Sequence, residues 1–121
     1  ELTNPSAAFY GVGGARIASQ DGATVRLDPE GDITVMVGVG EQGQGTEGIY
    51  RQIAADAVGV DITKVRVVTG DTDVTPYGGG TWASRGAGVG GEAVLLAGQA
   101  LRENILKVAA VILKREAAGL A

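Results

Sequence analysis

The sequence predicts an α+β fold: a small mixed or antiparallel sheet of about four strands, with two helices packed on it. Two observations predict this class. Short segments alternate apolar and polar residues with a period of two, as half-buried strands do. Two longer segments, at residues 46–58 and 89–117, repeat their apolar residues every three or four positions, as helices do. We expect a single domain over residues 1–121.

Four strands are expected around the first helix. They cover residues 15–19, 23–27, 33–39 and 65–69. Asp21 and Gly22 form a turn signal after the first strand, and "DPEGD" forms another after the second. In the latter, Pro29 and Gly31 stand where a short hairpin needs them. Residues 1–13 show no period and are expected to be irregular.

The first helix has signals at both ends. Thr46 is the predicted N-cap, and Glu47 adds negative charge to the first turn, where it favours the helix dipole. Gly59, followed by the apolar Val60, is expected to end the helix in a left-handed conformation.

The second helix is expected to be amphipathic and unusually long. Its apolar stripe consists of Val94, Ala97, Leu101, Ile105, Val108 and Ile112. Unbroken, it would exceed ~40 Å, which is long for a domain of this size. Either it breaks near Gly98, or its stripe packs on something outside the chain. In the second case, we expect an exposed apolar patch along this helix.

Composition excludes several classes of function. The net charge of −4 and the scattered basic residues argue against a nucleic-acid partner. Without Cys or His, the chain by itself offers no disulfide, thiolate zinc site, iron–sulfur ligand set or Ser-His-Asp triad. The apolar run "AVLLAGQAL" is shorter than the ~20 residues of a membrane span. No signal peptide is visible, so we expect a cytoplasmic protein without membrane association.

The glycine-rich stretch "VGVGEQGQGTEG" joins a predicted strand to a predicted helix, which is the general form of an anion cradle. It lacks the lysine of a P-loop. Gly38, Gly40 and Gly43 match GxGxxG, but there is no clear βαβ unit with an acidic residue after it. A tight turn that holds no ligand is an equal expectation from spacing alone. Gln42 and Gln44 suit a neutral or mixed partner, because amides both donate and accept hydrogen bonds.

The stretch "GDTDVTPYGGGTWASRGAGVGG" is a long irregular segment, and such segments in compact domains are usually functional or disordered. Asp71 and Asp73 could hold a metal, although a turn-forming role is commoner for Asp. Trp82 could stack on a ring or belong to the core. Arg85 could pair with a phosphate, or it could be solvated or play a structural role.

Taken together, the two glycine-rich loops point to a known family. The order is "GQG", a helix that ends in "ADAVGV", then "VRVVTGDT", "PYGGGTWASR" and a helix that begins with small residues. In this order and spacing, residues 33–110 resemble the large subunit of the molybdenum hydroxylases. This family includes xanthine dehydrogenase, aldehyde oxidase and aerobic carbon monoxide dehydrogenase. Because the chain is short and does not begin with Met, we expect an excised part of the molybdopterin-binding region.

The resemblance implies which residues contact the cofactor. In this family the glutamine of the GQG loop lies near the oxo ligand of the metal, which places that role on Gln44, between Gly43 and Gly45. Xanthine oxidases carry Met where this chain has Gln42. The loop residues implied to line the cofactor are Thr81, Ala83 and Ser84, followed by Arg85, Gly86, Ala87 and Gly88 close to the pterin or its nucleotide.

The resemblance also implies what the chain lacks. The catalytic glutamate of the family belongs to a later G-x-G-E motif. Glu41 and Glu92 also follow glycines, but they lie inside other motifs, so neither is assigned as the base. We therefore expect no catalytic residue and no direct metal ligand in this chain, and no activity of the chain alone.

For the parent protein, the resemblance implies molybdopterin with molybdenum, in the cytosine dinucleotide form. It also implies hydroxylation by water of an aldehyde, an N-heterocycle or a similar carbon. The implied partners are the rest of the large subunit and iron–sulfur and FAD subunits or domains. Two alternatives remain open: a stand-alone module that binds a nucleotide or phosphate, and an assembly domain without a ligand.

Overall fold

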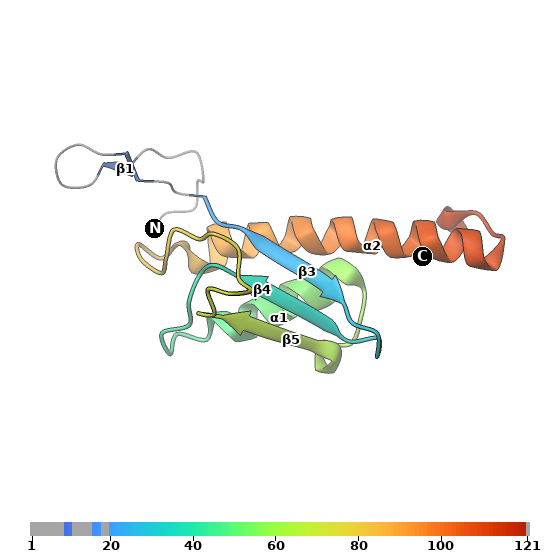
Figure 1. Cartoon of the computed structure of the whole chain (residues 1–121), viewed down its shortest axis with the longest axis horizontal. Helices are drawn as coiled ribbons and strands as arrows, with labels where there is room; N and C mark the ends of the chain where they lie inside the picture. The colour runs from blue at the N-terminus through green and yellow to red at the C-terminus, as the bar shows by residue number, and fades with distance from the viewer. Residues whose placement is uncertain (1–8, 11–15, 18–19, 121) are drawn as a thin grey trace.

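Two helices lie on one face of a small sheet in the computed structural model, which describes residues 9–10, 16–17 and 20–120 (Figure 1). The strands are β1 (Phe9–Tyr10), β2 (Arg16–Ile17), β3 (Ala23–Leu27), β4 (Ile33–Val37) and β5 (Val65–Thr69). The helices are α1 (Thr46–Val58) and α2 (Gly91–Leu113), with short helical turns η2 (Ile62–Lys64), η3 (Gly86–Gly90) and η4 (Ala117–Gly119).

The main sheet is mixed and has the order β3-β4-β5. β3 runs antiparallel to β4, with Val25 opposite Val35, and β5 runs parallel to β4, with Val67 opposite Val35. This confirms the predicted α+β class, with three strands in the sheet instead of about four. Of the strand predicted at residues 15–19, the structure describes β2, which pairs with β1 and not with this sheet. β1 itself lies in the segment that was expected to be irregular.

β4, α1 and β5 form a βαβ unit, because β5 returns parallel to β4 after the helix. The sequence interpretation, which found no clear βαβ unit, is wrong on this point. Alternation shows that a segment is a strand, but it does not show the direction in which two strands pair. The unit places the carboxyl ends of β4 and β5 at one edge of the sheet, beside the glycine-rich loop.

The ends of α1 are set by two glycines. Gly45, at φ 83°, takes the N-cap position and its carbonyl accepts a hydrogen bond from the Ile49 amide at 3.2 Å. The prediction of Thr46 as N-cap is therefore wrong by one residue. The prediction for the other end is confirmed: Gly59 is left-handed at φ 85°, and the amides of Gly59 and Val60 both donate to the Ala55 carbonyl.

The core lies between the sheet and the helices. All five residues of β4 are buried, since this strand lies at the centre of the sheet. The residues of the core cluster come from β4, its extension, both helices and β5: Ile33, Val35, Val37, Val39, Tyr50, Ala54, Ala55, Val58, Val65 and Val94.

α2 is continuous for 23 residues, about 35 Å, and does not break at Gly98. Gly98 is buried against α1, and a Cβ atom there would lie 2.7 Å from Cβ of Ala57. The glycine therefore allows two helices to approach closely, which explains its place in a helix interior.

The last turns of α2 run past the end of the sheet (Figure 1). Here the apolar side chains are exposed: Val108, Val111, Ile112 and Leu113. Val111 is 78% exposed although it is as apolar as a core residue. The expected apolar patch is present, and we refer to these four residues as the α2 patch.

Candidate functional site

A cavity of about 690 Å³ opens where the two glycine-rich loops meet. Nine of the eleven predicted cofactor-binding residues line it: Gln42, Gln44, Thr81, Ala83, Ser84, Arg85, Gly86, Ala87 and Gly88. Gly43 and Gly45 are not among the lining residues, and Thr46, Ile49 and Trp82 complete the lining. Residues more than 30 positions apart in the sequence are thus brought to one cavity.

The Gln44 side chain is held at both ends of its amide. Its Oε1 atom accepts a hydrogen bond from the Gln42 backbone amide at 2.6 Å, and its Nε2 atom donates to Oγ1 of Thr46. Thr46 is buried at the start of α1, so this contact ties an exposed amide to a rigid element. The carboxamide of Gln44 is therefore oriented by the loop itself.

Glu41 lies inside the same loop, with its carboxylate among backbone amides. Oε1 accepts from the amides of Gly43 at 2.6 Å and Gly45 at 3.1 Å, and Oε2 accepts from the Glu47 amide at 3.0 Å. The hydrogen bond from Glu47 is the main cause that lowers the pKa of Glu41 below its ordinary value, and the bonds from Gly45 and Gly43 add to it. The anion position of this cradle is thus occupied by a side chain of the chain itself.

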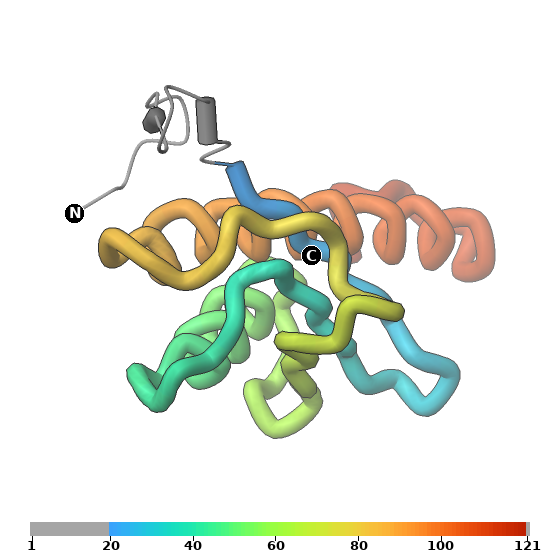
Figure 2. The backbone as a smooth tube through the Cα atoms, turned by 60° about the vertical axis from the view of Figure 1, so that its left-hand side comes forward, coloured from blue at the N-terminus to red at the C-terminus, as the bar shows by residue number. Residues whose placement is uncertain are grey.

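A hydroxyl group connects the two loops. Oγ1 of Thr81 donates to the Gly40 carbonyl at 2.6 Å. Figure 2 shows the second loop passing from the end of β5 across the first loop to the start of α2. The separation of the two cavity walls is therefore set by a direct hydrogen bond.

The second loop carries an unusual backbone. Ala83 and Ser84 have positive φ angles of 51° and 57°, and they follow Gly80, at 85°, by three and four positions. Left-handed conformations are uncommon for residues with a Cβ atom, and they concentrate at functional sites. Sequence reasoning missed this feature, because Ala and Ser carry no signal for it.

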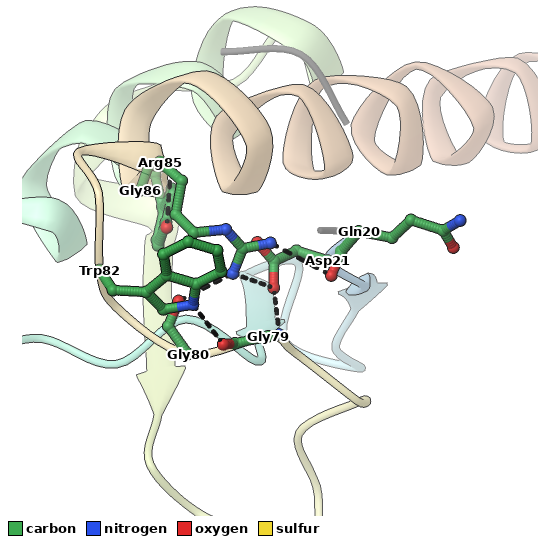
Figure 3. Close-up of polar contacts among 8 residues, drawn as sticks. Gln20, Asp21, Gly79, Gly80, Trp82, Arg85 and Gly86 are labelled. Carbon is green, nitrogen blue, oxygen red and sulfur yellow. Dashed lines mark hydrogen bonds and ion pairs between the residues drawn. The ribbon is translucent and has the colours of Figure 1, made fainter. Parts of the chain in front are cut away.

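Arg85 belongs to the interior of this loop and not to its open surface (Figure 3). Its side chain is fully buried, and its Nη2 atom lies 2.8 Å from the equally buried carboxylate of Asp21. Nη1 donates to the Gly80 carbonyl at 2.8 Å and Nη2 to the Gln20 carbonyl at 3.3 Å. Of the roles considered for Arg85, these contacts favour the structural one, and the burial of its side chain contradicts a solvated one.

The partners of Arg85 complete a small buried network. Oδ1 of Asp21 also accepts from the Gly79 amide at 2.7 Å. Burial raises the pKa of Asp21 above its ordinary value, while the Gly79 amide and the guanidinium oppose that shift. Trp82 lies over Arg85, with its ring centroid 5.2 Å from the guanidinium carbon, and its Nε1 atom donates to the Gly79 carbonyl (Figure 3).

Two close backbone approaches hold the second loop against the rest of the fold. A Cβ atom at Gly38 would lie 2.6 Å from the backbone of Gly78, so both positions require glycine. Behind the cavity, Oη of Tyr50 donates to the Gly86 carbonyl at 3.0 Å, and Gly90 leaves room for the phenol ring. These glycines therefore allow the second loop to lie close to the sheet and to α1.

The acidic pair of this loop forms a turn. The Asp71 carboxylate accepts a hydrogen bond from the Asp73 amide at 3.0 Å, as turn-forming Asp residues do. In residues 9–10, 16–17 and 20–120, no three His, Cys, Asp or Glu side chains are grouped so that they could hold a metal ion. The cavity instead offers side-chain amides, hydroxyls and the backbone amides at the start of η3. These groups suit a polar organic molecule that carries phosphate.

Comparison with known proteins decides the family. A family model described as a molybdopterin cofactor-binding domain matches residues 5–121. The chain belongs to this family. The resemblance inferred from the two loops is thereby confirmed.

Curated relatives are much longer than this chain. A putative xanthine dehydrogenase molybdenum-binding subunit of Escherichia coli is 41% identical over 82% of the chain and 13% of its own length. The nicotine 6-hydroxylase large subunit of Paenarthrobacter nicotinovorans is 34% identical over 94% of the chain and 14% of its own length. The chain thus spans about an eighth to a seventh of these relatives, whose names place them in complexes of several subunits.

Solved structures agree with the sequence comparison. A Cu,Mo carbon monoxide dehydrogenase matches with a TM-score of 0.76 at 32% identity, over 82% of this chain and 12% of that one. Quinoline 2-oxidoreductase from Pseudomonas putida matches with a TM-score of 0.73 at 40% identity, over 81% of this chain and 12% of that one. The cofactor implied for the chain is molybdopterin with molybdenum.

The cavity fits such a cofactor in size and chemistry. A volume of about 690 Å³ is within the ~300–1,000 Å³ usual for small-molecule sites. Small side chains at Ala83, Gly86, Ala87 and Gly88 leave the backbone accessible on one wall.

A bilayer-spanning helix is not found in the part of the chain that the structure describes.

Proposed function

We propose that this chain forms one wall of the molybdopterin site in a molybdenum hydroxylase. The enzyme would be an oxidoreductase that hydroxylates an aldehyde, an N-heterocycle or a similar carbon with water. The observation that carries the proposal is the cavity itself, since nine residues chosen from family motifs line one space. Relatives named as a xanthine dehydrogenase subunit and a nicotine hydroxylase subunit support the reaction class.

The two walls have different tasks in this proposal. The cofactor would supply the redox and oxygen-transfer chemistry when bound. Gln44, oriented by Gln42 and Thr46, would present its carboxamide to the molybdenum end. Gly86, Ala87 and Gly88 would receive the pterin or its nucleotide, because the first amides of a helix have no partner within the helix.

The cytosine dinucleotide form of the cofactor, a cytoplasmic location and the partners belong to the same proposal. The partners would be the rest of the large subunit and iron–sulfur and FAD subunits or domains. The absence of Cys and His from this chain supports that arrangement, because the iron–sulfur ligands would have to come from elsewhere. The catalytic base would likewise lie outside these 121 residues.

Gln44→Ala tests the proposal. In the cofactor-loaded protein that carries this chain, we expect turnover to fall roughly 10- to 100-fold, because one oriented hydrogen-bonding group near the metal's ligands is lost. Molybdenum content, measured by elemental analysis, should stay at the wild-type level. Gln52→Ala is the matched control, since Gln52 is an exposed residue of α1 outside the cavity. Equal turnover in Gln44→Ala and wild type would contradict the assignment.

A further inference from the structure

The carboxylate of Glu41 stands at the centre of the first loop, where the sequence offered it as a tempting catalytic group. It does not line the cavity. Its two oxygens accept the three backbone hydrogen bonds from Gly43, Gly45 and Glu47. A group held in this way is unsuited to act as a base toward a substrate, because its lone pairs are directed into the backbone.

These three bonds determine the path of the loop. The donors alternate along residues 43–47, so their amides must converge on one point, and Gly43 and Gly45 reach it with φ angles of 91° and 83°. Bonds to a charged acceptor are about twice as strong as neutral ones. The convergence places negative charge at the start of α1, where the helix dipole favours it.

The same loop orients Gln44. The residue sits between the two glycines that donate to Glu41, and its Oε1 atom accepts from the Gln42 amide, one residue after Glu41. Glu41 thus folds the backbone on which both partners of the Gln44 carboxamide depend.

We infer that Glu41 is a positioning residue, whose carboxylate folds the 41–47 loop around itself and thereby holds the Gln44 amide in the cavity wall. It also fills the place that a phosphate would take in a P-loop, so this loop presents amide side chains, not an anion site, to the cavity. The consequence for turnover rests on the proposed function, whereas the folding of the loop does not.

Hydrogen exchange followed by mass spectrometry tests the anchoring in the cofactor-loaded protein, independently of activity. In Glu41→Gln, we expect the amides of Gly43, Gly45 and Glu47 to exchange roughly tenfold faster or more, because their charged acceptor is lost. Glu47→Gln is the matched control: it removes the same charge from the start of α1, and its amide oxygen can still accept from Thr69. Wild-type protection in Glu41→Gln, or equal acceleration in both variants, would overturn the inference.

A double-mutant cycle tests the action through Gln44. Turnover per molybdenum is measured for Glu41→Gln, Gln44→Ala and the double variant. If Glu41 acts by placing Gln44, the double variant should be no slower than Gln44→Ala alone. Effects that multiply would refute this coupling. If Gln44→Ala alone leaves turnover unchanged, the site assignment of the proposed function fails, and the exchange experiment still decides whether Glu41 anchors the loop.

Discussion

Three charged residues near the cavity form their bonds with other groups of the protein. Glu41 is bonded to backbone amides, and Asp21 and Arg85 are bonded to each other. Apart from Arg85, whose buried guanidinium is paired with Asp21, the residues that line the cavity are uncharged, while these charged groups fix the two loops. Such an arrangement suits a ligand recognised by many hydrogen bonds.

Removal of one member of the buried pair should be costly. We expect Arg85→Met to lower the free energy of unfolding by about 3–5 kcal/mol, because the Asp21 carboxylate would stay buried without its partner. Urea denaturation of the purified protein measures the change. Adding Asp21→Asn should recover part of the loss, since it removes the orphaned charge.

The control for this prediction is a pair at the surface. Arg26 lies 2.8 Å from Asp28, but its side chain is 57% exposed, so Arg26→Met should change the free energy of unfolding by about 0–1 kcal/mol. A similar loss of stability in both variants would show that the buried pair contributes no more to the free energy of unfolding than the exposed pair.

Elements whose ends carry residue-specific signals could be predicted from the sequence. Gly59 ended α1 as expected, because only a residue without a Cβ atom adopts its left-handed conformation at little cost. The start was misplaced by one residue, because Thr46 is a good N-cap in general, while Gly45 and Glu41 together supply the cap here. The parallel pairing of β4 and β5 was missed, because an alternating apolar pattern does not show whether two strands pair in parallel or antiparallel.

Two glycines of the first loop region should respond oppositely to the same change. Gly38→Ala places a Cβ atom 2.6 Å from the backbone of Gly78, and we expect it to destabilise the protein by about 1–3 kcal/mol. Gly48→Ala meets nothing within 4 Å on an exposed turn of α1, and it should stabilise by about 0.5–1 kcal/mol. Thermal unfolding of both variants checks this pair, and a shift of the same sign in both would contradict it.

At the scale of the whole molecule, the sequence indicated residues that the fold brings to one cavity, but not the contacts that hold them there. The family motifs selected nine residues that line one cavity. The left-handed pair Ala83 and Ser84, the partner of Arg85 and the contribution of Ile49 to the lining were not predicted. Each depends on contacts between distant segments, such as Asp21 with Arg85, which no local pattern records.

The α2 patch should make the isolated chain associate. We expect the Val111→Gln, Ile112→Gln variant to bind less hydrophobic dye and to self-associate less, because two largely exposed apolar side chains are replaced. Dye fluorescence and analytical ultracentrifugation measure both effects. Glu103→Gln with Lys107→Gln is the control, since it alters exposed residues of the same part of the helix without removing apolar surface. Equal association in both variants would argue against the patch as its cause.

The carboxylate of Glu41 also has a consequence for biogenesis. A loop that becomes ordered only when its ligand binds lowers the affinity, because ordering the loop costs free energy. Here the carboxylate belongs to the chain itself, so the loop can reach its final conformation in the newly made protein before any cofactor is delivered. Insertion of the cofactor can then be the last step of maturation, into a wall that is already set.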